Sequence, residues 1–357
     1  MAASGAAQIE MIVIDWLKEL VGFPKEASGI MVSGGSMANL SAVAAAREAR
    51  LGGADARAIV YCSDQTHSSV AKGLRIIGFR PDQRRTVATD DSLRLSLPAL
   101  EAAIKEDRAA GRLPFCVVAN AGTTNTGAVD PLGPLADLCA RENIWLHVDG
   151  AYGAAAVITE RGRAALSGIE RADSVPFELG CLLVRDPAVL RRAFRVEDAD
   201  HPDYLADVTR HIQDDMNFYE HGIQLTRSFK ALKLWLSLRA YGLAEFRRAI
   251  DVGFDMAELA ERTLVASGRW AIVTPAQMGV VTFRWSDATK SDAEIDAITS
   301  RTVDLMREDG YALVMSTMLK RRPALRLCPI HPATTPDEIR ETVARLERFS
   351  QAAAASE

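Results

Sequence analysis

A short apolar run that ends in a single carboxylate constrains this chain more than any other segment. Ile144 to Val148 contains β-branched and aromatic residues, which favours a buried parallel strand over a helix. Asp149 follows at the carboxyl end of this strand, where open α/β sheets bind their ligands. Its carboxylate can pair with a positively charged ring, or the residue can simply open a turn or cap a helix. The neighbouring segments favour the first interpretation.

Strand-like runs alternate with helical patterns over most of the chain. The strands expected before Leu225 are Ile30–Ser33, Ala58–Cys62, Phe115–Ala119, Ile144–Val148 and Cys181–Val184, and the helices include Leu97–Ala110 and Pro134–Glu142. This alternation predicts an α/β fold with a large, mainly parallel sheet covered by helices. We expect a large domain over residues 1–225, followed by a C-terminal helix and a small α+β domain over residues 226–357. The elements expected there are strands near Trp270–Val273, Val280–Trp285 and Ala324–Cys328 and helices near Asp292–Asp309 and Pro336–Ser350.

The strand that begins at Ile30 runs into Ser33-Gly34-Gly35-Ser36 and then into an Ala-rich helical stretch. Free N–H groups at a helix start favour a phosphate, and Ser36 can add a hydroxyl donor. Glycine lets the backbone approach a ligand closely. The alternative is that Ser36 is an ordinary N-cap.

Two further strands end in polar loops. His67 follows the run Ala58–Cys62, and its imidazole can stack on an aromatic ring or serve a structural role. Thr123, Thr124 and Asn125 follow the next strand and can donate hydrogen bonds. Because parallel strands end at one edge of a sheet, these loops are expected to converge with Asp149 on one rim.

These four segments, in this order, resemble the group II decarboxylases that depend on pyridoxal 5'-phosphate (PLP), and most closely the bacterial aromatic-L-amino-acid and tyrosine decarboxylases. The resemblance extends from Ala7–Trp16 to Ala324–Cys328. It implies the PLP-dependent transferase-like fold, known as fold type I. It also implies decarboxylation of an amino acid, with PLP as cofactor.

The resemblance assigns a role to individual residues. Gly35 and Ser36 match the phosphate-binding turn, His67 matches the histidine that stacks on the pyridine ring, and Asp149 matches the partner of the ring nitrogen. Ala151 matches the small residue that packs under the ring. Thr124 matches the residue beside cofactor and substrate, and Thr123 is an equally good match.

One departure from the family concerns the catalytic amine. Members continue a segment like Ala172–Val175 into a turn whose lysine forms a Schiff base with PLP, whereas Val175 is followed here at once by Pro176 and the next strand. No other lysine is a convincing substitute. Lys72 follows His67 in an expected helix, and Lys230 and Lys233 belong to an amphipathic helix that the family shares without catalytic use. The remaining lysines lie in segments without a cofactor motif: Lys18, Lys25, Lys105, Lys290 and Lys320. Family chains also carry a long segment before the part that matches Ala7–Trp16. Omission, truncation and loss of catalysis are all compatible with these gaps, and the intact cofactor motifs favour omission or truncation.

The resemblance also implies a proton donor on a mobile loop, here Asp200 to Gly222. Alignment places Phe218 near the family's tyrosine, with Tyr219 one residue away, and we predict Tyr219 as the donor. The alternative is an aromatic side chain that anchors the loop. A phenylalanine at that position is associated in the family with aldehyde synthesis, so one alternative function is an aromatic aldehyde synthase. The missing lysine leaves a second alternative, a non-catalytic cofactor-binding relative.

Composition agrees with a cytoplasmic enzyme. A net charge of −5 without a basic run argues against a nucleic-acid partner. No apolar stretch is long enough to span a membrane, and the N-terminus lacks a signal-peptide pattern. The five cysteines lack metal-ligand spacing and are expected to be buried thiols. The resemblance implies a small amino-acid substrate and a homodimer with shared active sites.

Overall fold

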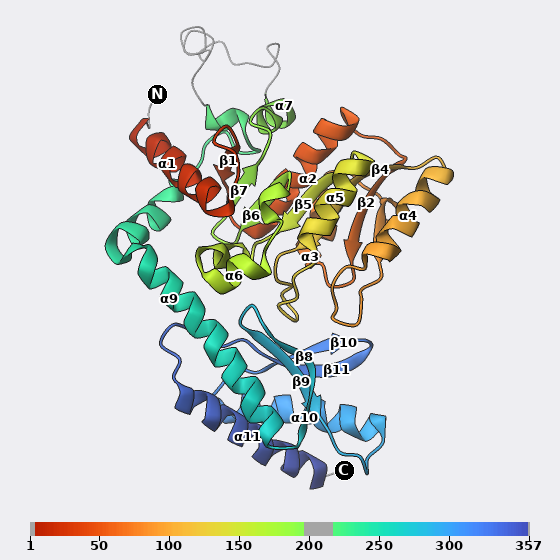
Figure 1. The fold of residues 1–357 in the computed structure, drawn as a ribbon, viewed down its shortest axis with the longest axis vertical. Helices are drawn as coiled ribbons and strands as arrows, with labels where there is room; N and C mark the ends of the chain where they lie inside the picture. Colours follow the sequence, from red (N-terminus) through yellow and green to blue (C-terminus); the bar gives the residue numbers. More distant parts are fainter. Residues whose placement is uncertain (1–3, 196–216, 356–357) are drawn as a thin grey trace. The chain divides into compact units, whose positions relative to one another are not determined.

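The structure is a computed structural model that describes residues 4–195 and 217–355. These residues form two compact units (Figure 1). The first contains residues up to 121, 129–157 and 164–240, and the second contains residues 122–128, 158–163 and those from 241 onward. The domain boundary expected after residue 225 stays a prediction.

A seven-stranded sheet forms the centre of the first unit. Its strands lie in the order β1 (Ser28–Met31), β7 (Cys181–Val184), β6 (Ser174–Phe177), β5 (Trp145–Asp149), β4 (Leu113–Asn120), β2 (Ala58–Ser63) and β3 (Arg84–Val87). The pairs from β6 to β3 are parallel, and β7 is antiparallel to both of its neighbours. The carboxyl ends of β1, β2, β4 and β5 therefore share one edge, which is the rim expected to bind a ligand.

Helices cover this sheet. They are α1 (Ser4–Val21), α2 (Gly35–Leu51), α3 (Ser68–Ile76), α4 (Leu97–Ala109), α5 (Leu132–Glu142), α6 (Glu160–Ala165) and α7 (Val189–Phe194). Helix α2 packs against β4 to β7 together with α3 and α7, whereas α4 and α5 pack beside each other near β3 to β5 (Figure 1). Alanines on the buried side of α2 let this helix lie close to the strands. Short 3-10 turns complete the unit: η1 (Pro81–Gln83), η2 (Ala154–Ile158), η3 (Ile169–Arg171) and η5 (Phe218–Glu220).

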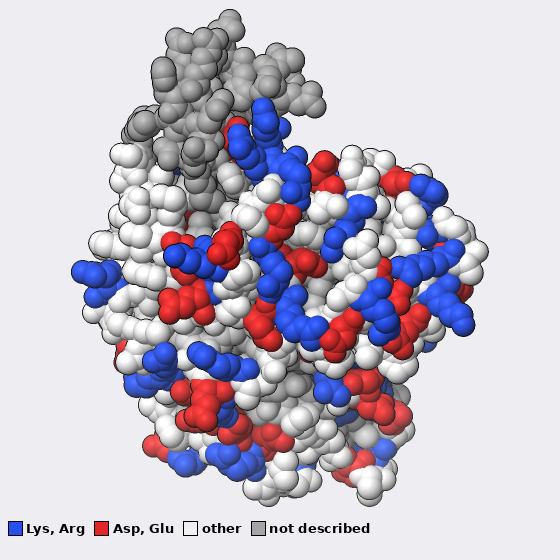
Figure 2. Space-filling model, turned by 45° about the horizontal axis from the view of Figure 1, so that its top comes forward, with Lys and Arg blue, Asp and Glu red and all other residues white. Residues whose placement is uncertain are grey.

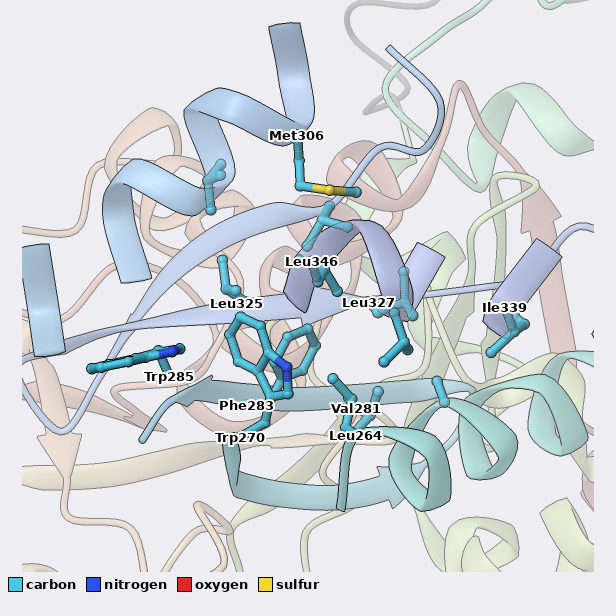
Figure 3. Close-up of a cluster of buried hydrophobic side chains, with 14 of the residues drawn as sticks. Leu264, Trp270, Val281, Phe283, Trp285, Met306, Leu325, Leu327, Ile339 and Leu346 are labelled. Carbon is cyan, nitrogen blue, oxygen red and sulfur yellow. The ribbon is translucent and has the colours of Figure 1, made fainter. Parts of the chain in front are cut away.

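The second unit is built on an antiparallel sheet with the strand order β10 (Met315–Leu319), β11 (Arg322–Leu327), β9 (Val280–Trp285) and β8 (Trp270–Gln277). Helices α10 (Asp292–Asp309) and α11 (Pro336–Ala355) pack with it. The core is apolar: Trp270 packs edge-on against Phe283, with ring centroids 5.2 Å apart, beside Leu325 and Met306 (Figure 3). A capping box between Ser291 and Glu294 begins α10.

A long helix, α9 (Ala231–Ala266), is interrupted at Gly242, whose φ of 74° is not helical. On the surface, basic and acidic side chains are interspersed on the face in Figure 2. Within residues 4–195 and 217–355, no helix combines the length and apolar character needed to cross a membrane. Four cysteines are buried as expected, but Cys328 is only half-buried.

Candidate active site

Asp149 is the last residue of β5, as predicted, and its side chain is only 7% exposed. Residues two apart in a strand point to the same face. Trp145, His147 and Asp149 therefore share the face of β5 that contacts α2. The Asp149 carboxylate accepts one hydrogen bond at each oxygen: Oδ2 from Asn39 Nδ2 at 2.9 Å and Oδ1 from the Ala151 backbone N–H at 3.1 Å.

The glycine turn before α2 lies against the segment after Asp149. A Cβ added to Gly35 would lie 3.0 Å from Ala151 Cβ, which is tighter than an ordinary contact, so this close approach favours glycine. The N-cap of α2 is Gly34, which has a φ of 149° and offers no side-chain cap. The N-cap interpretation of Ser36 was wrong, because α2 already begins at Gly35 and Ser36 is an exposed residue of its first turn. The first N–H groups of α2 are thus available to an external anion.

His67 is exposed and is the N-cap of α3. Its Nδ1 accepts a hydrogen bond from the Ser69 backbone N–H at 3.2 Å and lies 2.8 Å from Ser69 Oγ. The structural role left open for His67 is therefore present, and its exposed ring leaves stacking on a ligand as a prediction. Ser69 Oγ also accepts from Asn39 Nδ2 at 3.0 Å.

Asn39 was not identified from the sequence. It is a buried polar residue on the Ala-rich helix α2 and contacts both Asp149 and Ser69, which are 110 and 30 residues away in the chain. A polar residue on the apolar face of a helix was the available signal, but its partners could not be inferred from spacing.

Comparison with known proteins agrees with this geometry. Residues 2–286 match the pyridoxal-dependent decarboxylase conserved domain. The chain belongs to the pyridoxal-dependent decarboxylase family. It is 45% identical to the aromatic-L-amino-acid decarboxylase of Bacillus atrophaeus over 98% of this chain and 75% of that protein. It is 34% identical to the L-2,4-diaminobutyrate decarboxylase of Rhizobium meliloti (strain 1021), over 94% of this chain and 68% of that protein.

A solved structure supports the same assignment. The Oryza sativa TDC solved with PLP and tryptamine matches with a TM-score of 0.91 and 28% identity, over 98% of this chain and 77% of that one. The predicted family, fold class, cofactor and enzyme class are therefore confirmed: the fold is the α/β fold of PLP decarboxylases, and this is a PLP-dependent carboxy-lyase family.

The residues of the first unit fit the non-covalent parts of PLP. The uncapped N-terminus of α2 suits a phosphate. Asp149 retains acceptor capacity for a ring N–H, because each of its oxygens accepts from one donor among the residues that the structure describes. The contact between Gly35 and Ala151 brings the two parts of this cradle together.

The turn between β6 and β7 does not supply the family's amine. Phe177 pairs with Cys181, and only Glu178, Leu179 and Gly180 connect the two strands. Gly180 has a φ of 82° and packs on the glycine turn, where a Cβ would lie 2.2 Å from Val32 O. The Glu178 carboxylate faces the same place: its Oε2 lies 3.3 Å from the position of a Cβ on Gly35.

Thr123 and Thr124 lie in the loop 122–128, which belongs to the second unit, so its predicted convergence with Asp149 stays a prediction. Thr123 is buried, and its Oγ1 lies 2.8 Å from Thr126 Oγ1. Thr124 is exposed. Of the two equally good matches, Thr124 is thus the one whose side chain is accessible to a ligand.

Tyr219 lies in η5, which contacts α7. Its hydroxyl is buried without a hydrogen-bond partner among the described residues, and burial raises its pKa. Phe218 is buried beneath the guanidinium of Arg227, which also pairs with the buried Glu10, so Phe218 fits the anchoring role. The role of Tyr219 as proton donor stays a prediction. Residues 200–216 of the expected loop, including Tyr204, lie outside the described residues.

Proposed function

We propose that this protein decarboxylates an aromatic L-amino acid to its amine and CO2. The observation that carries the proposal is the buried carboxylate of Asp149 at the end of β5, held by Asn39 and Ala151 beside the uncapped N-terminus of α2. The greater identity to an aromatic-L-amino-acid decarboxylase, 45% against 34% for the diaminobutyrate enzyme, supports an aromatic substrate.

The side chains have distinct parts in this proposal. Gly35, Ser36 and the first turn of α2 bind the phosphate, while His67 and Ala151 lie on the two faces of the ring. Asp149 holds the proton on the ring nitrogen. When bound, PLP supplies an electron sink for the electron pair left at the substrate Cα after CO2 departs. Thr124, or Thr123, contacts the cofactor, and Tyr219 returns a proton to Cα.

Substrate preference tests this proposal. We expect kcat/KM for L-tryptophan, L-tyrosine or L-phenylalanine to exceed that for L-2,4-diaminobutyrate by at least about 100-fold, because a site built for an apolar ring leaves a second ammonium group unpaired. CO2 release and amine formation are measured with PLP in excess. An oxygen-dependent aldehyde product would instead identify an aldehyde synthase, and a preference for diaminobutyrate would contradict the aromatic assignment.

We further propose a cytoplasmic homodimer. Exposed apolar side chains gather in the segment before and within the start of α9: Ile223, Leu225, Phe229 and Leu236. Such a cluster is typical of an interface. Light scattering is expected to give twice the chain mass at micromolar concentration. Leu225→Glu should weaken the dimer by at least about 10-fold, because it places a charge in a desolvated surface. Ile76→Glu, at an equally exposed position on α3, is the control and should leave the mass unchanged.

A further inference from the structure

A buried chain of hydrogen bonds continues from Asn39 away from Asp149. Asn39 Oδ1 lies 3.0 Å from His147 Nε2, and His147 Nδ1 lies 2.8 Å from Ser174 Oγ. The indole Nε1–H of Trp145 donates to Ser174 Oγ at 2.9 Å. His147 and Ser174 are fully buried, and Asn39 is 1% exposed. Buried polar groups that are fully paired hold a single arrangement.

The direction of these hydrogen bonds follows from the Asp149 end of the network. The Asp149 carboxylate only accepts, so Asn39 must present its NH2 group to Asp149 and its amide oxygen to His147. His147 Nε2 must therefore carry the proton. In the neutral ring Nδ1 then accepts from the Ser174 hydroxyl, which itself accepts from the indole of Trp145. The contacts at the Trp145 end are compatible with this tautomer of His147.

A second branch reaches the other predicted cofactor contact. The remaining N–H of the Asn39 amide donates to Ser69 Oγ, which lies 2.8 Å from His67 Nδ1. Because Nδ1 also accepts the Ser69 backbone N–H, it is unprotonated, and His67 carries its proton on Nε2. One amide group thus contacts Asp149 directly and His67 through a single hydroxyl.

We propose that Asn39 is a positioning residue that orients Asp149 and His67 together for the pyridine ring, and that His147 and Ser174 hold its amide in the required orientation. The inference rests on the proposed function, since it requires Asp149 to pair with the ring nitrogen. It assigns to α2 a second role, besides the phosphate contact at its first turn.

Binding of pyridoxamine 5'-phosphate tests this role. This ligand has the ring and phosphate of PLP but no aldehyde, so its affinity does not depend on a lysine. Asn39→Leu keeps a similar volume and removes both donors, and we expect binding about 10- to 100-fold weaker, since hydrogen bonds to a charged group are lost. Ser69→Ala breaks only the branch to His67 and should weaken binding about 3- to 10-fold. If Asn39→Leu does not fold, binding of the ligand by Ser69→Ala tests the proposal.

The matched control is Ser41→Ala. Ser41 lies on the same helix and is 1% exposed, and its hydroxyl has no hydrogen-bond partner among the described residues. Its removal should leave the affinity unchanged. If Asn39→Leu folds and binds the ligand as tightly as the unaltered protein, or if Ser69→Ala does so where Asn39→Leu does not fold, the proposal is overturned.

Nitrogen NMR of the six histidines gives a readout without any ligand. Burial lowers the pKa of His147 to about 4. We therefore expect the His147 ring to be neutral, with its proton on Nε2, from pH 7 down to about pH 5. The His147 signal is assigned as the one that is lost in His147→Gln. Both Asn39→Leu and Ser69→Ala should change the nitrogen signal of His67. Asn39→Leu should also change the nitrogen signal of His147. A proton on Nδ1 of His147 in the unaltered protein overturns the proposal.

Failure of the unaltered protein to bind pyridoxamine 5'-phosphate contradicts the proposed function itself, whereas unchanged binding by the variants contradicts only the role of Asn39.

Discussion

Asp149→Ala is expected to lower the rate of amino-acid decarboxylation by at least about 1000-fold. The carboxylate lies at the end of β5 with one protein donor on each oxygen, and in our proposal it keeps the ring nitrogen protonated. Without that proton the ring would be a far weaker sink for the electron pair that stays at Cα when CO2 leaves. The rate is measured as CO2 release with PLP in excess, so weaker cofactor binding does not limit it.

Two further variants make this result specific. Asp149→Asn keeps the shape of the side chain but cannot hold a positively charged ring nitrogen, so we expect a similar loss of rate. Asp64→Ala removes an exposed carboxylate from the loop after β2 and should leave the rate unchanged. An Asp149→Asn enzyme that keeps more than about a tenth of the rate would show that Asp149 is not the ring partner, because the loss of a preorganised charge is far larger.

The rim of the sheet could be predicted because its parts are local. Asp149, His67 and the glycine turn each follow an apolar run, and the parallel arrangement brings them to one edge. Three strands, β3, β6 and β10, were not predicted, because their local sequence signals are weak. Strand β3 carries Arg84 and Arg85, and β10 is largely exposed. Strand β6 contains Pro176, which has no N–H to donate to a neighbouring strand.

The hydrogen-bond network could not be predicted in the same way. Asn39, His147 and Ser174 meet only because α2 packs across the strands, and such contacts carry no fixed spacing in the sequence. His147 within an apolar strand was a visible signal, as was Asn39 within an Ala-rich helix. The wrong N-cap at Ser36 has a different cause, since the backbone of Gly34, and not a side chain, begins α2.

The turn between β6 and β7 is expected to determine whether the cofactor is attached covalently. We expect borohydride reduction of the protein with PLP to leave the turn peptide unmodified, because residues 178–180 contain no lysine. Glu178→Lys should convert this into a reduced PLP adduct on that peptide, detected by peptide mass. The side chain at position 178 already reaches the glycine turn, since Glu178 Oε2 lies 3.3 Å from the position of a Cβ on Gly35.

Two controls separate the amine from the change in charge. Glu178→Gln removes the negative charge beside the phosphate turn without adding an amine, so it should strengthen PLP binding about 10-fold and give no adduct. Leu179→Lys adds an amine at the next exposed position of the same turn and should give much less adduct. A specific adduct on one lysine of the unaltered protein would show that another amine replaces the family's lysine. Because the cradle for ring and phosphate is built by other segments, the absence of an amine from this turn alters covalent attachment while the non-covalent contacts of PLP remain.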